Sequence, residues 1–497
     1  MRMPCKIKRL SQTIIITTLA SLLLVSPLAH SKKRPVLNFN KLDISASQKL
    51  SGKILYINET NTDVDLLIQN KSSLSYYPQF ITKGKDSAVQ LIEIPANVQS
   101  FNKGKLATND KEVLFYFTGS EVLAYDFVTK ESISILRVDS LFKHQENFDA
   151  VFGEFINDIN EDGLTDIVTY SFTHTNLYIQ QESGEFKHFD FDLPPKVEQE
   201  RDGVLFRPHK YYHVDVNNDD RKDITFRIKD QLVVFTQNSE RNFNKTPVKI
   251  NLNSGLAVNE SDDSKDKKLS VEINTIEDIN NDGIIDLITK ESKSDGLISR
   301  TSQLKIRYGY LENNITAFNA KHDGEAEFKG EGMIEFKDIN GDGFKDYYTL
   351  SVELGFGTIL DAISGSIEMD MRFYPSNKNG EFDQEPAYEN EIDIAINSGG
   401  DGGVNDIDDF NGDGLKDLLL RTDDDEFKIF SGSAKSLFLS RGVKYKNDMP
   451  DNVRIEVKDF NGDDKADILF LYSTYFDDDE EKEVGKNHIK LWLSKIQ

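Results

Sequence analysis

The chain has a single cysteine, Cys5, among its 497 residues. Cys5 lies in a basic N-terminal segment that we expect to be removed, so the mature chain would contain no thiol. Disulfide bonds and cysteine-ligated metal sites are therefore excluded. A large exported chain without disulfides needs another kind of cross-link, and bound metal ions can supply one.

Long apolar runs are also scarce, and the one that stands out is residues 10–25. It follows four basic residues and precedes a small-residue stretch, "SPLAHS", that ends at Ser31. This pattern predicts a signal peptide over residues 1–31 and export to the periplasm, cell surface or exterior; a buried helix or uncleaved anchor is the alternative. No other stretch approaches the roughly eighteen apolar residues of a spanning helix, so we expect no transmembrane anchor after cleavage.

Positive charge is in deficit, with 59 lysines and arginines against 85 aspartates and glutamates. The net charge is −26, and loss of the four basic residues of the signal takes it to −30. Because phosphate backbones would be repelled by such a chain, nucleic acid is not expected as a partner.

Long helical periodicity is absent, and an acidic nine-residue segment recurs instead. Successive first aspartates are 57, 63, 60, 71 and 50 residues apart, as in an array of supersecondary units. The six copies are "DINEDGLTD" (158–166), "DVNNDDRKD" (215–223), "DINNDGIID" (278–286), "DINGDGFKD" (338–346), "DFNGDGLKD" (409–417) and "DFNGDDKAD" (459–467).

Each copy runs directly into an apolar, strand-like segment such as "ILFLY", and further strand-like runs and turns follow. The pattern predicts an all-β chain, a single β-propeller of four-stranded antiparallel blades over residues 35–497. Two degenerate units, 52–70 and 104–117, bring the expected number of blades to eight, with seven as the alternative. The last unit lacks one strand, and residues 35–44 are expected to supply it by pairing with the C-terminal strand, which leaves no open edge.

The repeated segment has the oxygen donors that calcium prefers. Side chains at loop positions 1, 3, 5 and 9 and the carbonyl at position 7 would surround the ion. Asp stands at position 1 in Asp158, Asp215, Asp278, Asp338, Asp409 and Asp459. Asn stands at position 3 in Asn160, Asn217, Asn280, Asn340, Asn411 and Asn461. Asp stands at position 5 in Asp162, Asp219, Asp282, Asp342, Asp413 and Asp463.

The loop is completed by a carbonyl and a third carboxylate. The carbonyl at position 7 belongs to Leu164, Arg221, Ile284, Phe344, Leu415 and Lys465. Asp stands at position 9 in Asp166, Asp223, Asp286, Asp346, Asp417 and Asp467. Zinc would want histidine or thiolate, and magnesium would keep several waters, so calcium in up to six structural sites is the prediction. A set of solvated acidic turns is the alternative.

Position 6 must turn the chain sharply and is glycine in four copies, whereas Asp220 and Asp464 stand there in the other two. We expect these two loops to close in the left-handed conformation, with weaker ion binding. Apolar residues at position 2 and after position 9 are expected to anchor each loop in the core. The degenerate units lack the full aspartate set, so no metal is expected there.

These loops with their flanking strands resemble the FG-GAP and VCBS repeats of secreted bacterial proteins and the calcium-binding blades of integrin α-subunit propellers. Residues 151–170 and 404–421 carry the resemblance best, and residues 49–148 carry it faintly. The resemblance implies calcium ions that rigidify the blades while other loops bind partners. Such propellers serve in adhesion, carbohydrate binding, assembly and, as scaffolds, in some polysaccharide lyases.

Outside the loops, the segment "RPHKYYHVD" is the most unusual. In one continuous strand, Arg207, His209, Tyr211 and His213 would share a face and could bind a sugar or transfer a proton. A buried, hydrogen-bonded histidine is the plainer interpretation. We interpret three further segments as loops: the acidic tips 259–268 and 477–481 and the glycine-rich segment 396–406. Trp492 is interpreted as a core residue.

The leading functional hypothesis is an exported, non-enzymatic binding or adhesion module for a protein or glycan. There are two alternatives: a polysaccharide lyase that uses residues 207–213, and an envelope assembly factor.

Overall fold

The computed structural model describes residues 37–496 apart from short gaps. The gaps are residues 47–49, 51–52, 61, 71, 88, 110, 143–149, 201–202, 255–268, 296–298, 330, 353–365, 378–380, 384, 396–404, 424, 435–436, 450–452 and 478–481. The predicted signal peptide lies outside the described residues, as do the tips 259–268 and 478–481 and most of the glycine-rich segment. No helix in the described part is long and apolar enough to cross a membrane.

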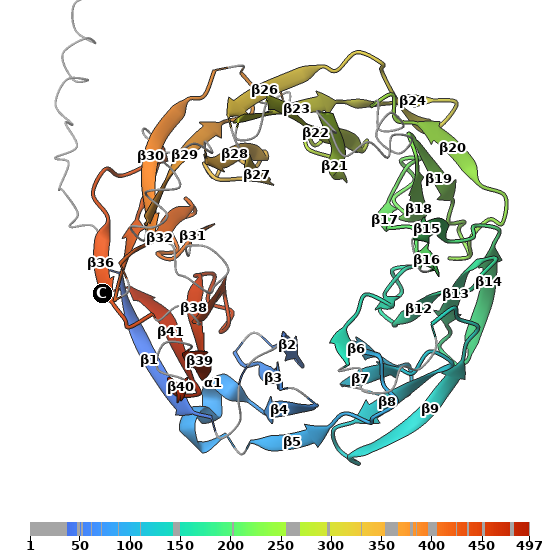
Figure 1. The fold of residues 1–497 in the computed structure, drawn as a ribbon, viewed down its shortest axis with the longest axis horizontal. Helices are drawn as coiled ribbons and strands as arrows, with labels where there is room; N and C mark the ends of the chain where they lie inside the picture. Colours follow the sequence, from blue (N-terminus) through green and yellow to red (C-terminus); the bar gives the residue numbers. More distant parts are fainter. Residues whose placement is uncertain are drawn as a thin grey trace, which may run out of the picture.

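Eight four-stranded antiparallel sheets are arranged in a ring, which confirms the eight-bladed β-propeller (Figure 1). Blades 1 and 2 are the two degenerate units. Blade 1 contains β2 (Ile54–Ile57), β3 (Asp65–Gln69), β4 (Ser73–Tyr77) and β5 (Gln90–Glu93). Blade 2 contains β6 (Ser100–Lys105), β7 (Glu112–Phe117), β8 (Glu121–Asp126) and β9 (Glu131–Arg137), with the short β10 (Val151–Phe152) parallel to β6.

Blades 3 to 7 follow in chain order. Blade 3 has β11 (Ile156–Asn157), β12 (Asp166–Tyr170), β13 (Thr175–Gln180) and β14 (Phe186–Phe191), and blade 4 has β17 (Tyr211–Val214), β18 (Asp223–Ile228), β19 (Gln231–Phe235) and β20 (Val248–Asn251). Blade 5 has β21 (Leu269–Glu277), β22 (Asp286–Asp295), β23 (Ser299–Arg307) and β26 (Gly324–Lys329). Blade 6 has β27 (Glu331–Lys337), β28 (Asp346–Val352), β29 (Ser366–Tyr374) and β30 (Tyr388–Ala395), and blade 7 has β31 (Asn405–Asp408), β32 (Asp417–Asp423), β33 (Glu426–Phe430) and β36 (Val443–Lys446).

Blade 8 closes the ring by joining the two ends of the chain, as predicted. It contains β37 (Arg454–Lys458), β38 (Asp467–Tyr472), β41 (His488–Ile496) and, as its outer strand, β1 (Leu37–Ser45). β1 pairs with β41 without interruption from Leu37 opposite Ile496 to Ser45 opposite His488. Trp492 of β41 is 2% exposed and belongs to the core, as expected.

In the part of the chain that the structure describes, four small hairpins and one short helical segment complete the fold. The hairpins are β15 (Lys196–Glu200) with β16 (Gly203–Arg207), β24 (Gly309–Glu312) with β25 (Ile315–Phe318), β34 (Gly432–Ser433) with β35 (Leu437–Phe438), and β39 (Tyr475–Asp477) with β40 (Lys482–Val484). The helical segment is α1 (Phe80–Lys83) followed by the 3-10 turn η1 (Gly84–Asp86).

The hydrophobic core lies between blades rather than within them. The buried apolar residues form eight clusters, and each cluster joins two neighbouring blades, including blades 8 and 1. Second strands such as β38 (DILFLY) are buried along their whole length because both faces meet another blade. Outer strands such as β36 (VKYK) alternate with charge because one face meets water.

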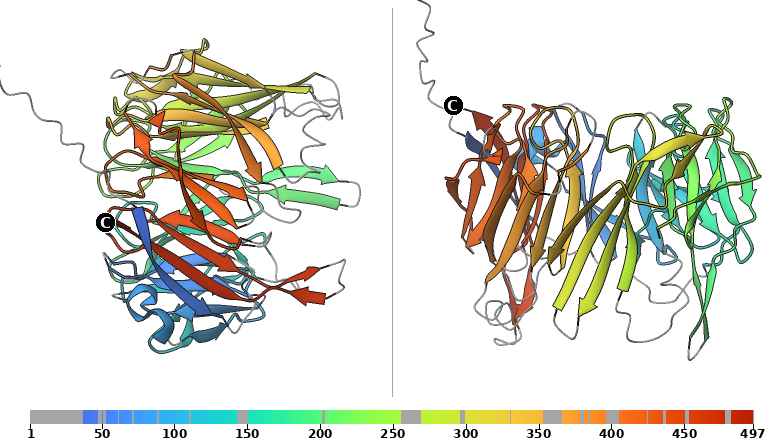
Figure 2. Two further views of the ribbon diagram at one scale, coloured as in Figure 1. Left: turned by 90° about the vertical axis from the view of Figure 1, so that its left-hand side faces the viewer. Right: turned by 90° about the horizontal axis from the view of Figure 1, so that it is seen from above.

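The alternation of strand direction gives the ring two different faces. Connections from first to second strand and from third to fourth strand lie on one face, which carries all six acidic segments and is called the loop face here. Connections from second to third strand and from each blade to the next lie on the other, called the hairpin face. The hairpins β15–β16 and β39–β40 project from the hairpin face (Figure 2).

The closure can be tested at Ile44, which is 6% exposed on β1 and packs between blades 8 and 1. We expect Ile44→Ala to lower the free energy of unfolding by about 2–5 kcal/mol, because it leaves a cavity in that interface. Thermal melts followed by circular dichroism measure the change, and Asn40→Ala, at an exposed position of the same strand, is the control. Equal melting temperatures for the two variants would show that β1 does not close the ring.

Candidate metal sites in six repeated loops

The six acidic segments have the same place in the fold. Each joins the first and second strands of one blade, in blades 3 to 8, and its ninth residue is the first residue of the second strand. This ninth carboxylate is fully buried, at 0% exposure, in Asp166, Asp223, Asp286, Asp346, Asp417 and Asp467. The predicted anchors are buried as well: position 2 is at most 4% exposed in every copy.

The ninth aspartate ties its loop to the third strand through two backbone amides. In blade 6, Asp346 Oδ2 accepts from the amide of Ile339 at 3.0 Å, and Asp346 Oδ1 accepts from the amide of Ser376 at 3.0 Å. All six copies repeat this pair of bonds, from the position-2 amide and from an amide of the third strand or just after it. The carboxylate therefore fixes the geometry of the loop.

The first and fifth aspartates turn the rest of the loop inward. Asp338 Oδ1 accepts from the amides of Gly341 at 2.8 Å and Asp342 at 3.2 Å, and Asp338 Oδ2 accepts from Gly343 at 3.0 Å. Asp342 Oδ1 in turn accepts from the amide of Phe344 at 3.0 Å. Three carboxylates are thus held in one short loop with most of their amide partners in the loop itself.

Two positions in each loop require the left-handed backbone conformation. Position 6 has positive φ in all six copies, including 62° at Asp220 and 61° at Asp464, as predicted. Position 4 is also left-handed, from 53° at Asn218 to 76° at Gly341, which we had not predicted. The residues there are asparagine or glycine in five copies and glutamate in one, Glu161, so the composition did contain the signal.

The loops fit a calcium ion by the chemistry of their donors. Positions 1, 3, 5 and 9 present only carboxylate and amide oxygens, with the carbonyl of position 7 in addition. Two of the position-3 oxygens, Asn217 Oδ1 and Asn411 Oδ1, are buried without a hydrogen-bond partner. Within the described residues, no three histidine, cysteine or acidic side chains are grouped closely enough to hold a metal as they stand.

Two of the six loops differ in a way that bears on ion affinity. The loops with aspartate at position 6 have a cation at position 7, Arg221 or Lys465, and that cation pairs with the position-5 carboxylate. Arg221 contacts Asp219 in blade 4, and Lys465 lies 3.0 Å from Asp463 in blade 8. In the other four loops position 7 is Leu, Ile or Phe. The side chains at positions 6 and 7 thus separate two kinds of loop.

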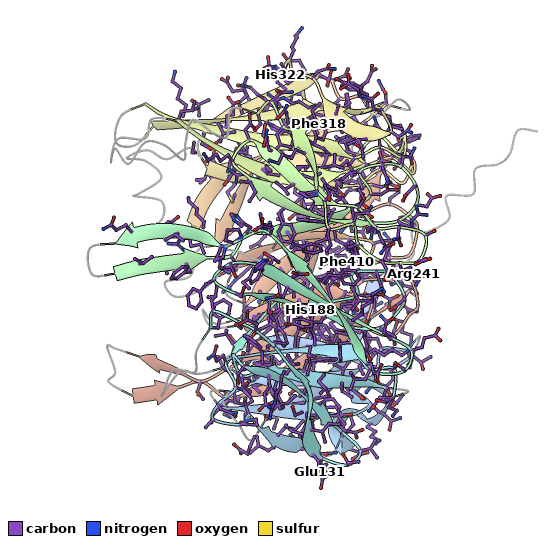
Figure 3. All side chains as sticks on the ribbon, turned by 90° about the vertical axis from the view of Figure 1, so that its right-hand side faces the viewer. Glu131, His188, Arg241, Phe318, His322 and Phe410 are labelled. Carbon is purple, nitrogen blue, oxygen red and sulfur yellow. The ribbon has the colours of Figure 1, made fainter. Side chains whose placement is uncertain are left out.

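Neighbouring loops also contact one another around the loop face. Arg241 of blade 4 donates to the carbonyl of Glu161 in blade 3 at 2.8 Å, and Lys222 pairs with the Glu161 carboxylate at 3.0 Å. Further along the ring, the amide of Ala466 donates to the carbonyl of Asp409 at 2.7 Å. Figure 3 shows Arg241 on the side of the ring opposite the projecting hairpins.

In blade 1, hydrogen bonds to an aspartate also close the equivalent turn. Asp65 opens β3 and accepts from the Gln79 amide at 2.7 Å, from Asn58 Nδ2 at 2.8 Å and from Tyr76 Oη at 2.7 Å. Asp65 is therefore the counterpart of the ninth aspartate. Sequence reasoning missed it because the turn before it is shorter than in the acidic copies.

Burial raises the pKa of every ninth aspartate. The pKa rises to about 8 in Asp166, about 7 in Asp286, Asp417 and Asp467, and about 6 in Asp223 and Asp346. Desolvation is the largest cause, and the negative charge of nearby loop aspartates adds to it, whereas the two amide hydrogen bonds lower the pKa. A proton or a cation therefore stabilises this carboxylate in the folded chain.

The segment 207–213 does not form the single strand face that we predicted. Arg207 ends β16, where it pairs with Glu198 at 2.6 Å, whereas Tyr211 begins β17 of blade 4. Pro208 interrupts the strand between them, because proline has no amide hydrogen for a ladder bond. His209 Nε2 lies 3.0 Å from the carbonyl of Pro194.

His213 lies at the contact between blades 3 and 4. Its Nε2 donates to the carbonyl of Ile159 at 2.6 Å and so connects blade 4 to the acidic loop of blade 3. Burial lowers its pKa. Arg207, His209 and His213 thus have different partners: Glu198 and the carbonyls of Pro194 and Ile159.

Comparison with curated proteins and with protein-family models finds no match in sequence. Solved structures with a similar fold include a lectin of Agrocybe aegerita that recognises non-reducing terminal N-acetylglucosamine, at 12% identity and a TM-score of 0.39 over 83% of this chain and 95% of that one. The β-propeller of Nup133 from Vanderwaltozyma polyspora is 11% identical, with a TM-score of 0.41 over 78% of this chain and 95% of that one. The V. cholerae biofilm matrix protein Bap1 is 9% identical, with a TM-score of 0.31 over 92% of this chain and 91% of that one. At these values the likeness carries no argument about function.

The raised pKa values predict how the calcium-free protein responds to pH. An aspartate that titrates near 3.9 when unfolded and between about 6 and 8 when folded stabilises the fold below 3.9 and loses that contribution as the pH rises through 6 to 8. We therefore expect the melting temperature in chelator to fall between pH 6 and pH 8.

The matched variant for this measurement is Asp166→Asn, which removes the group with the highest pKa and keeps its shape. The fall above pH 7 should be smaller in Asp166→Asn than in the unaltered chain. An identical pH profile for the two proteins would contradict the assignment.

Proposed function

We propose that the protein is an exported, calcium-stabilised β-propeller that binds a protein or glycan partner. The observation that carries the calcium assignment is the repetition of one geometry in six blades, each with a fully buried carboxylate beside two others. Positions 1, 3, 5 and 9 and the carbonyl of position 7 would hold each ion. The bound ion would neutralise the carboxylates and cross-link the first and second strands of the blade.

The partner surface in this proposal is the hairpin face. The acidic repeats occupy the loop face, where their charge and their shared geometry serve the fold. Phe172, Val197 and Val204, in connections of the hairpin face, are 53 to 60% exposed, and Phe172 packs edge-on against Phe206 of the hairpin β15–β16 with ring centroids 5.0 Å apart. Exposed apolar side chains that lie together are typical of interaction sites.

Chelation tests the structural role of calcium. We expect the melting temperature to fall by at least about 10 °C when the protein is transferred into chelator, because several ions that bind only the folded state are removed together. Calcium should restore the original value, and magnesium at the same concentration should not, because magnesium dehydrates reluctantly. An unchanged melt in chelator would refute calcium as a structural component.

The two kinds of loop predict unequal sites. We expect calcium titration by calorimetry to resolve four tighter sites and two weaker ones, the weaker being loops 215–223 and 459–467. Arg221→Leu gives loop 215–223 the position-7 residue of loops 158–166 and 409–417, and should tighten that site about tenfold by removing a nearby positive charge. Arg227→Leu, in the strand that follows, is the control. Equal tightening by both variants, or by neither, would contradict the effect of position 7.

A further inference from the structure

In five of the six acidic loops, the fourth residue lies against the next loop of the ring. This residue has positive φ in every copy and stands between positions 3 and 5, two of the proposed ligand positions. Its contacts are with positions 6 to 8 of the following loop. The pairs are Glu161 with Lys222, Asn218 with Gly283, Asn281 with Gly343, Gly341 with Gly414, and Gly412 with Lys465.

Two of these contacts are made directly to the backbone of the next loop. At Gly341 of blade 6, a Cβ atom would lie 2.6 Å from the carbonyl oxygen of Gly414 in blade 7, so the contact requires glycine. Asn281 Nδ2 of blade 5 donates to the carbonyl of Gly343 in blade 6 at 3.1 Å. A shift of one loop would therefore be felt by the backbone of the next.

Backbone hydrogen bonds also connect the loops of blades 6, 7 and 8. The amide of Lys416 donates to the carbonyl of Ile339 at 3.2 Å, and the amide of Ala466 donates to the carbonyl of Asp409 at 2.7 Å. Lys416 and Ala466 both occupy position 8, between the carbonyl at position 7 and the buried carboxylate at position 9. Each bond thus joins a segment that proposed ligands flank on both sides to the start of the preceding loop.

The row of contacts ends where the ring closes. Gly462, the fourth residue of the last loop, lines a cavity of about 220 Å³ together with Glu59 and Asp63 of blade 1. Blade 1 has no copy of the acidic segment, so the six loops form an open row from blade 3 to blade 8.

These contacts determine the sign of any coupling between neighbouring loops. Ordering one loop fixes the segments that touch its neighbour, so less conformational entropy is lost when the neighbour is ordered in turn. Repulsion between two bound cations would oppose this effect. Each loop brings three carboxylates against the two charges of one calcium ion, however, so this repulsion is offset within each loop.

We propose that neighbouring loops bind calcium cooperatively, as a row of nearest-neighbour sites from blade 3 to blade 8. Filling one loop increases the calcium affinity of the loops beside it, through position 4 and, in blades 6 to 8, also through the amide of position 8. This inference rests on the proposed calcium binding and specifies how its sites are connected.

Hydrogen exchange followed by mass spectrometry during a calcium titration measures each loop separately. Asp282→Asn removes one carboxylate of loop 278–286 and keeps an acceptor for the Ile284 amide. We expect this variant to raise the calcium concentration at which loop 338–346 is half protected by at least about threefold, an effect of the size of one hydrogen bond. Loop 459–467, which is not a neighbour, is the internal control and should keep its midpoint.

The matched variant for the coupling is Asn281→Gly. It removes the hydrogen bond to Gly343 and leaves every proposed ligand in place, and glycine already stands at position 4 in three other copies. In this background, Asp282→Asn should shift the midpoint of loop 338–346 much less. Because coupling between sites is reciprocal, Asp342→Asn should in turn raise the midpoint of loop 278–286.

The possible failures are distinguishable. If calcium protects the loops but Asp282→Asn leaves the midpoint of loop 338–346 unchanged, the coupling is refuted and the calcium sites stand. Equal shifts in loops 338–346 and 459–467 would refute it too, because they would show a loss of stability throughout the ring. If calcium protects none of the loops, the proposed calcium binding fails and the coupling fails with it.

Discussion

One buried carboxylate organises each of six blades. The aspartate that begins the second strand is removed from water, receives two backbone amides and lies near two other carboxylates of its loop. Burying a charge in this way is costly unless it is paired, and amide hydrogen bonds offset only part of the cost. The raised pKa values reflect the part of this cost that the amides do not offset, so a proton or a cation stabilises these carboxylates in the folded chain.

The two faces of the ring differ in how strongly the fold constrains their sequences. On the loop face, the repeated segment must keep two left-handed positions, a buried position 2 and a buried position 9, so little freedom is left there. On the hairpin face, the connections bear no such common requirement, and their lengths vary from blade to blade. The β15–β16 hairpin, which projects from that face, belongs to this second group.

The repeat made much of the fold predictable. A buried aspartate every 50 to 71 residues marks six of the blades and the position of their loops, and two degenerate units with strand-like runs brought the expected number to eight. The missing strand of the last unit predicted the role of β1. Features that occur in only one unit were harder to predict. Residues 207–213 alternate like a strand, but Pro208 ends one element and the next begins at Tyr211. Side-chain pairing, such as Arg221 with Asp219, depends on rotamers that sequence spacing does not determine. Calcium and export stay predictions from the sequence.

The ring closes between blades 8 and 1, and blade 1 has no copy of the nine-residue acidic segment. There, Asp65 satisfies its carboxylate with Asn58, Tyr76 and the Gln79 amide, and Lys458 of blade 8 pairs with Glu59 at 2.7 Å. β1 adds nine residues of continuous pairing across the two ends of the chain. Because stability in a repeat array is passed between neighbours, the direct contacts at this seam stabilise the closed ring without any contribution from the loops of blades 3 to 7. Closure at blades 8 and 1 and the ion binding that we propose for blades 3 to 8 would therefore be separate sources of stability.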